Sequence, residues 1–174
     1  MSVAGIDFGT TNSSVALVTG ESKVELASFT FAGSETLSSR SVLYFEQVKA
    51  PGGVKRTHGL SGPAAIERYL DSDEKGRLIQ SLKSHLTSRT LTGTEVFGRR
   101  HRLEELISRI LSDLRKHAEK QFERPIRYAV VGRGRSAGLH TSDRRLFAAQ
   151  SRRNADVDDQ CSGRRLLLVS QADS

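Results

Sequence analysis

The chain has 174 residues, a single cysteine and a formal net charge of +7 at pH 7. This length gives room for about one domain with a hydrophobic core. The lone Cys161 excludes an internal disulfide framework and a cysteine-ligated metal site, so we expect a reducing compartment and a cytoplasmic location. No apolar run approaches the roughly 18 residues of a membrane span, and no basic, signal-like start is present, so we expect no membrane partner.

The positive charge is spread along the chain. Residues 1–132 carry 19 Lys and Arg against 15 Asp and Glu, whereas residues 133–174 carry 8 Arg against 5 Asp. Neither part interleaves aromatic and basic residues as a base-stacking surface does, and the five histidines show no metal-ligand spacing. The composition therefore argues against a nucleic-acid partner.

Strands are predicted over most of the first 50 residues. Two β-rich runs, 3–8 and 14–18, flank the polar turn 9–13, and a third run covers 23–31. We therefore expect three consecutive antiparallel strands. A fourth strand is predicted at 41–45, before a turn that contains a Pro-Gly-Gly sequence.

Helices are predicted in the middle of the chain. A helix start is indicated at Ser61, because a capping residue stands before a proline in the first turn. Apolar spacing between 73 and 88 predicts a second helix with Lys83 beside its apolar stripe. The strongest pattern runs over 103–122 and predicts a long amphipathic helix, which is followed by a buried strand at 126–132. A helix that feeds a strand indicates an α/β layer.

The composition changes after Gly132. Residues 133–174 contain no lysine and no glutamate, although the first 132 residues contain 7 Lys and 11 Glu. The few apolar residues of this segment cannot bury enough surface to offset the entropy of an ordered backbone. We expect residues 134–174 to form a disordered tail behind one folded region, 1–133.

The polar turn after the first strand is suited to phosphate. Backbone N–H groups and hydroxyls there form a concavity that binds phosphate oxygens, and glycine lets a ligand approach the backbone closely. A carboxylate such as Asp7 can hold a hydrated Mg²⁺ that bridges phosphates. The sequence contains no Gly-Lys-Ser/Thr, so this is not a Walker loop. From these residues alone, an ordinary hairpin turn stays an open alternative.

Residues 5–14 resemble the first phosphate loop of the 70-kDa heat-shock chaperones, a branch of the actin and sugar-kinase ATPase superfamily. Three further stretches are similar in the same order: 59–65, the lysine-bearing 77–83, and the helix and strand over 104–133. The resemblance covers residues 3–133 and is closest to the bacterial YegD-like members. It implies a partial actin-like, ribonuclease H-like ATPase lobe with a mixed sheet and flanking helices.

The resemblance also implies a site that binds ATP or ADP with Mg²⁺. Asp7 would position the Mg²⁺ through water, and Lys83 would approach the γ-phosphate and the attacking water, so these two are the expected catalytic residues. The β- and γ-phosphates would lie against four consecutive residues: Gly9, Thr10, Thr11 and Asn12. Unfolded-protein clients and co-chaperones are implied only for a full-length relative.

The resemblance stops after Arg133, where the family would continue into a second lobe with another Asp-x-Gly-Gly-Gly-Thr loop. We therefore expect a truncated ATP-binding lobe without full ATPase activity. We hypothesise that a shift of reading frame produced the residues from about 134 onward, which the genomic DNA read in all three frames would test. Two alternatives stay open: a fragment of a sugar- or acetate-kinase-like phosphotransferase, and a non-enzymatic basic interaction module that uses the arginine-rich tail.

Overall fold

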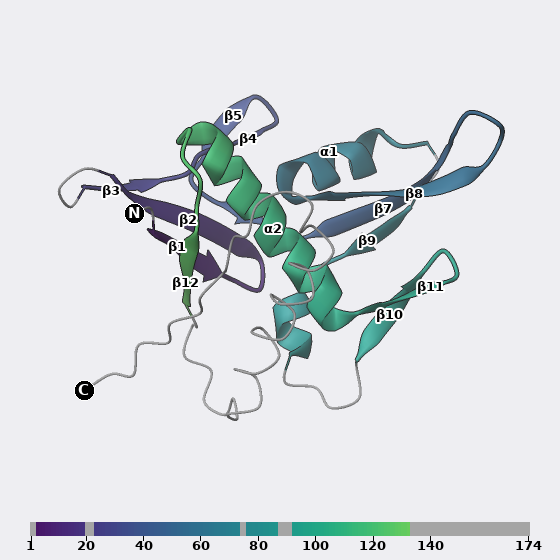
Figure 1. The fold of residues 1–174 in the computed structure, drawn as a ribbon. Coiled ribbons are helices and arrows are strands. Elements are labelled where there is room, and N and C mark those ends of the chain that lie inside the picture. The colour runs from purple at the N-terminus through teal and green to yellow at the C-terminus, as the bar shows by residue number, and fades with distance from the viewer. Residues whose placement is uncertain (1–2, 20–22, 74–75, 87–91, 133–174) are drawn as a thin grey trace.

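The fold was analysed in a computed structural model that describes residues 3–19, 23–73, 76–86 and 92–132 (Figure 1). These residues form an α/β structure with a mixed sheet, as the sequence predicts. The expected disordered tail at 134–174 lies outside the described residues. Within the described part of the chain, no helix is long and apolar enough to cross a membrane.

The larger sheet has five strands in mixed orientation. Its order is β12 (Tyr128–Gly132), β1 (Val3–Phe8), β2 (Asn12–Thr19) and β3 (Lys23–Leu26), and the short β6 (Ser39–Arg40) pairs with the start of β2. β1 runs parallel to β12 and antiparallel to β2, and β2 is antiparallel to β3. The three consecutive antiparallel strands predicted from sequence are confirmed.

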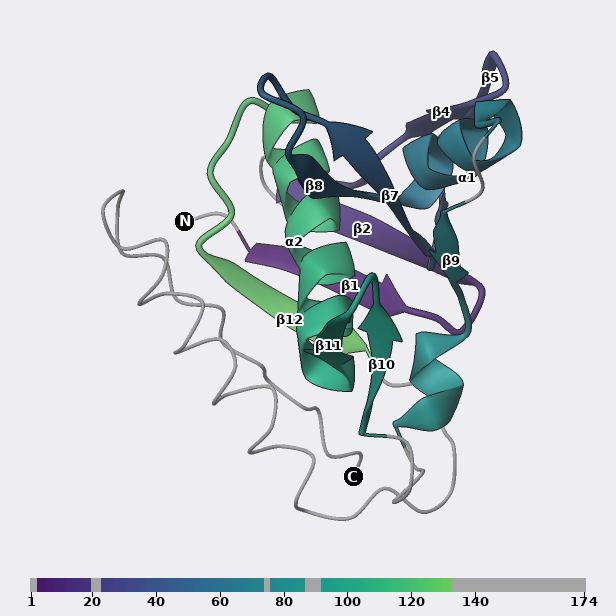
Figure 2. The same cartoon turned by 90° about the vertical axis from the view of Figure 1, so that its right-hand side faces the viewer.

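One face of this sheet packs against α2 (Leu103–Gln121), which crosses β1, β2 and β12 (Figure 2). Strand residues alternate between faces, so Ala4, Ile6 and Phe8 are buried, while the residues between them are exposed. Asp7 therefore lies on the face away from α2.

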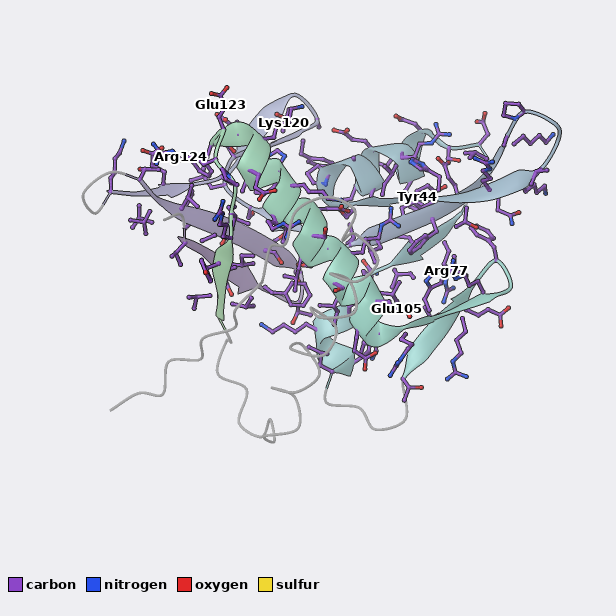
Figure 3. The ribbon with its side chains drawn as sticks, in the orientation of Figure 1. Tyr44, Arg77, Glu105, Lys120, Glu123 and Arg124 are labelled. Atoms are coloured by element: carbon purple, nitrogen blue, oxygen red, sulfur yellow. The ribbon has the colours of Figure 1, made fainter. Side chains whose placement is uncertain are left out.

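The predicted long helix is confirmed as α2, with bounds close to those expected. Its apolar stripe is buried in the main core, as residues three and four apart share one side of a helix: Leu103, Leu106, Ile107, Ile110, Leu111, Leu114 and Ala118. Glu105 Oε2 accepts a hydrogen bond from the Arg102 N–H at 3.2 Å, which satisfies a donor at the first turn. Figure 3 shows Glu105 near this end of α2 and Lys120, Glu123 and Arg124 at the other end.

A second, antiparallel sheet has the order β8 (Lys55–Ser61), β7 (Leu43–Lys49) and β9 (Arg77–Ile79). Helix α1 (Gly62–Asp71) follows β8 directly and packs against this sheet and β4 (Phe29–Phe31). Two hairpins complete the described fold. One joins β4 to β5 (Ser34–Thr36), and the other joins β10 (Gly93–Val96) to β11 (Arg99–Arg102).

The helix predicted between 73 and 88 is wrong. Leu78 lies in β9, opposite Tyr44 of β7, whereas Leu82 begins a short 3-10 helix, η1 (Leu82–His85). Ser81 separates the two elements in a left-handed conformation, with φ 58°. Leu78 is partly buried in the cluster around Tyr44, whereas Leu82 is buried in the main core. The helical spacing of the apolar residues between 73 and 88 thus comes from two different elements, β9 and η1.

Other predicted boundaries also change. The run 23–31 forms two strands, β3 and β4, which belong to different sheets. The strand predicted at 41–45 begins at Leu43 and extends to Lys49. Neither β8 nor the β10–β11 hairpin was predicted. β8 and β11 are rich in Lys, Arg and His and lack the alternating apolar pattern of a half-buried strand.

Candidate functional site

The candidate site is the turn between β1 and β2, which we call the phosphate loop and define as residues 9–12. Asp7 lies just before it and pairs in register with Ser14 of β2 and Gly132 of β12. Thr10, Thr11 and Asn12 are exposed. The two threonines and the asparagine therefore present their polar side chains at the surface.

Gly9 is needed where the chain reverses. Its N–H donates to Ser13 Oγ at 3.3 Å, and a Cβ at this position would lie 2.1 Å from the Asn12 carbonyl oxygen. Real Cβ atoms do not approach backbone oxygen so closely, because the contact is far inside van der Waals distance. The tight turn thus depends on glycine for close packing of the backbone on itself, whereas the sequence suggested glycine for the close approach of a ligand.

A buried hydroxyl pair supports the loop from below. The Oγ atoms of Ser13 and Ser41 are 2.7 Å apart, and both side chains are almost fully buried. The Ser41 N–H also donates to the Thr11 carbonyl oxygen at 2.8 Å. Buried polar groups are stable only when they are hydrogen-bonded, so these two contacts tie residues 39–41 to the loop.

Lys83 reaches the base of the same loop. Its Nζ donates to the carbonyl oxygen of Phe8 at 2.5 Å, across 75 positions of sequence. The lysine is half-buried and projects from η1, not from the longer helix that the sequence predicted. An ammonium group has three donors, and among the described residues the structure gives one hydrogen bond from Lys83 Nζ. The structure therefore gathers Asp7, the phosphate loop and Lys83 at one end of β1.

Sequence reasoning missed two residues of this site, Arg40 and Ser41. Arg40 lies opposite Asn12 in the β6–β2 pair, and its Nη1 donates to Asn12 Oδ1 at 3.4 Å. Both residues stand 28 or more positions from the loop residues that they contact. No local pattern in the sequence indicates that β6 pairs with β2.

The polar groups at this site suit a metal ion that is coordinated only partly by the protein, with water and phosphate oxygens at its other positions. Within the described ranges, no group of three or more His, Cys, Asp or Glu side chains could hold a metal ion. Mg²⁺ in phosphate sites is usually held by one or two carboxylates together with waters and the substrate phosphates. Asp7 alone therefore fits a hydrated Mg²⁺ that arrives with a nucleotide, and it does not form a complete metal site.

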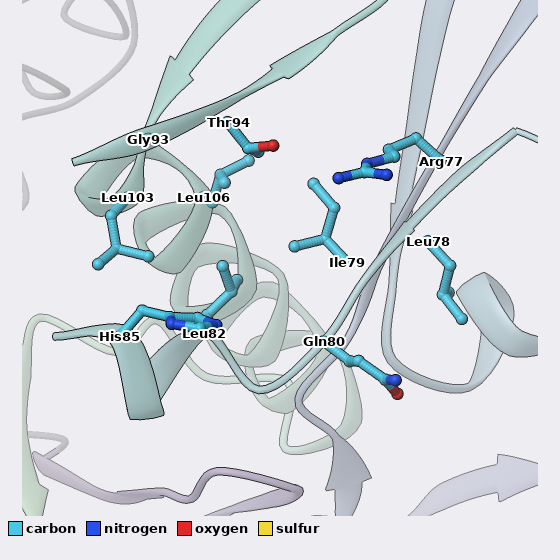
Figure 4. A pocket seen from close by; sticks show the side chains of 10 residues that line it. All are labelled: Arg77, Leu78, Ile79, Gln80, Leu82, His85, Gly93, Thr94, Leu103 and Leu106. Atoms are coloured by element: carbon cyan, nitrogen blue, oxygen red, sulfur yellow. The ribbon is translucent and has the colours of Figure 1, made fainter. Parts of the chain in front are cut away.

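A separate hollow of about 290 Å³ lies between β9, η1, β10 and α2 (Figure 4). Its lining is mainly apolar, and the polar residues in it are Arg77, Gln80, His85 and Thr94. Among the described residues that line it there is no carboxylate, the usual side-chain ligand of Mg²⁺. Leu82 and His85 of η1 face this hollow, while Lys83 between them contacts β1.

Comparison with protein-family models gives no match, and comparison with curated proteins gives none either. The function is therefore argued from the site and the sequence resemblance.

Proposed function

We propose that the chain is a nucleotide-binding lobe of the 70-kDa heat-shock chaperone type, which binds the phosphates of ATP or ADP, with Mg²⁺, at the phosphate loop. The proposal rests on the sequence resemblance described above and on one contact. Lys83, which that resemblance places at the phosphates, lies with its Nζ on the Phe8 carbonyl, one residue before the loop.

The chemistry of the loop supports this assignment. Gly9 keeps the turn tight, so the neighbouring backbone and the Thr10 and Thr11 hydroxyls are available to phosphate oxygens. Lys83 adds positive charge where a phosphate would lie, and a charge-assisted hydrogen bond is roughly twice as strong as a neutral one. Asp7 supplies the carboxylate for the Mg²⁺ that accompanies the nucleotide. These groups bind and orient a polyphosphate.

Titration calorimetry with Mg-ATP tests the proposal. We expect the unaltered chain to bind and Lys83→Ala to weaken binding at least about tenfold, which corresponds to the loss of roughly 1.4 kcal/mol. Lys116→Ala is the matched control, because Lys116 is an exposed lysine of α2. Thermal unfolding of each variant checks that it is folded. Absence of binding by the unaltered chain, or equal binding by Lys83→Ala, would contradict the proposed function.

A further inference from the structure

Arg40 places a second cation at the phosphate loop. It projects from β6, and β6 is held to the loop by backbone pairing of Arg40 with Asn12 and of Ser39 with Ser13. The side chain is exposed, and its Nη1 reaches Asn12 Oδ1 at 3.4 Å. The guanidinium group therefore lies beside the last residue of the loop, on a different element from Lys83.

The face on which Arg40 lies follows from the strand register. Asn12 and Ser14 are two residues apart on β2, so they share one face of the sheet. Ser14 pairs with Asp7 and Asn12 pairs with Arg40. All four side chains therefore belong to the face away from α2, at the end of the sheet where the phosphate loop lies.

Within the part of the chain that the structure describes, Arg40 uses few of its hydrogen-bond donors. A guanidinium group carries five N–H donors and stays charged at any physiological pH. Among the described residues Arg40 has one hydrogen bond, to a neutral amide, and no carboxylate within ion-pair distance. Arginine recognises phosphate in a two-pronged geometry that lysine cannot reproduce.

The position of Arg40 is fixed by packing as well as by pairing. Ser39, its neighbour, is buried, and a Cβ on Gly62 would lie 2.4 Å from Ser39 Oγ. On its other side, Ser41 is buried against Ser13. The backbone of β6 therefore has little freedom, while the side chain of Arg40 remains at the surface. A rigid backbone with a free cationic end is well suited to ligand binding.

We propose that Arg40 is a phosphate-binding residue that contacts the polyphosphate of a nucleotide directly, as the second cation of the site beside Lys83. This inference rests on the proposed function. Arg40 balances the charge of the bound polyphosphate, and its contact with Asn12 keeps it close to the loop.

The test compares four forms of the full chain by titration calorimetry with Mg-ATP and, separately, with inorganic tripolyphosphate. Arg40→Gln removes the charge, and Arg40→Lys keeps it. Arg56→Gln is the matched control, because Arg56 is an exposed arginine on β8. We expect Arg40→Gln to raise the Kd for both ligands about tenfold, Arg40→Lys to recover part of the loss, and Arg56→Gln to change the Kd less than twofold.

A salt titration distinguishes a direct contact between Arg40 and phosphate from an indirect role in which Arg40 only positions Asn12. A direct phosphate contact makes the dependence of log Kd on log salt shallower in Arg40→Gln than in the unaltered chain, because one fewer ion is displaced. An unchanged Kd in Arg40→Gln, a loss for Mg-ATP without a loss for tripolyphosphate, or an unchanged salt slope would overturn the inference while the proposed function stands. If the unaltered chain binds neither ligand, both fail together.

Discussion

Gly9 and Gly5 show how one residue type has two different roles within the same stretch of chain. A Cβ on Gly9 would collide with backbone at Asn12, whereas a Cβ on Gly5 would meet no atom within 4 Å. Gly5 lies on the exposed face of β1 and Gly9 at the reversal of the chain. The structure therefore requires glycine at position 9, where two parts of the backbone come close together, and not at position 5.

The first prediction concerns this contrast. Gly9→Ala should lower the free energy of unfolding by about 1–3 kcal/mol, since the loop must shift to admit the methyl group. The same shift should weaken Mg-ATP binding. Gly5→Ala is the control and should stay within about 0.5 kcal/mol of the unaltered chain. Urea unfolding measures both, and equal effects of the two substitutions would contradict the assigned role of Gly9.

His101 is the second residue whose environment leads to a testable prediction, because its pKa differs between the folded and unfolded states. Its ring stacks on Phe45 with centroids 5.5 Å apart, and its side chain is only 16% exposed. Burial lowers the pKa of His101 below its usual value of 6.5; the nearby Arg99 and Arg109 lower it further, and Glu105 partly opposes them. The folded state therefore takes up this proton at lower pH than the unfolded chain does.

The second prediction follows from that difference. As pH falls below about 6.5, the unfolded chain binds the proton first, so the contribution of His101 to stability decreases with acidification and is fully present above that pH. We expect unfolding free energy to fall less between pH 7.5 and 5.5 in His101→Gln than in the unaltered chain. An identical pH response in His101→Gln would contradict the prediction.

At the scale of elements, α2 organises the main core. It covers one face of the larger sheet and also contacts η1, β8 and β11, so it joins the parts of the chain that carry the phosphate loop and Lys83. Ile107 is fully buried in this core, while Lys116 on the same helix is exposed. The position of η1, and with it the lysine, therefore depends on the packing of this helix.

The third prediction tests α2. Ile107→Ala should destabilise the protein by about 2–5 kcal/mol, because it removes buried methyl groups and leaves a cavity. Lys116→Ala should change stability by less than about 0.5 kcal/mol. Chemical unfolding followed by circular dichroism measures both, and a small effect of Ile107→Ala would show that the helix packs less closely than the structure indicates.

At the scale of the whole molecule, the groups that we propose as phosphate ligands, Asp7, the phosphate loop and Lys83, lie together at one end of β1. The sequence contains no second Asp-x-Gly-Gly-Gly-Thr loop that could contact the phosphates from the other side. Hydrolysis requires the attacking water and the developing charge to be held in a site that excludes bulk solvent. On the proposed function, we therefore expect these groups by themselves to support binding of Mg-ATP and not its hydrolysis.

The fourth prediction concerns the rate at which the chain releases phosphate from ATP. Purified chain that binds Mg-ATP should release phosphate no faster than a Lys83→Ala sample under the same conditions. The comparison with Lys83→Ala also removes any signal from contaminating ATPases. A turnover that disappears in Lys83→Ala would contradict the prediction and show that the chain is catalytically sufficient.

Local sequence patterns predicted the elements whose buried residues repeat at a regular spacing. The sequence by itself predicted α2, because seven buried positions repeat at helical spacing, and the β1–β2 hairpin, because strand-forming runs flank a glycine turn. Both signals are carried by neighbouring residues. Asp7, the phosphate loop and Lys83 were grouped by the family resemblance, because the residue pattern alone left an ordinary hairpin turn as an open alternative.

Only the tertiary structure decided the features that depend on distant pairing. It divided the apparent helix between 73 and 88 into β9 and η1, because Leu78 packs beside Tyr44 and Leu82 in the main core. It likewise brought Lys83 to Phe8 and Arg40 to Asn12. Contacts across 28 or 75 positions leave no periodic signal in the sequence, since chain packing and not local propensity selects the partner.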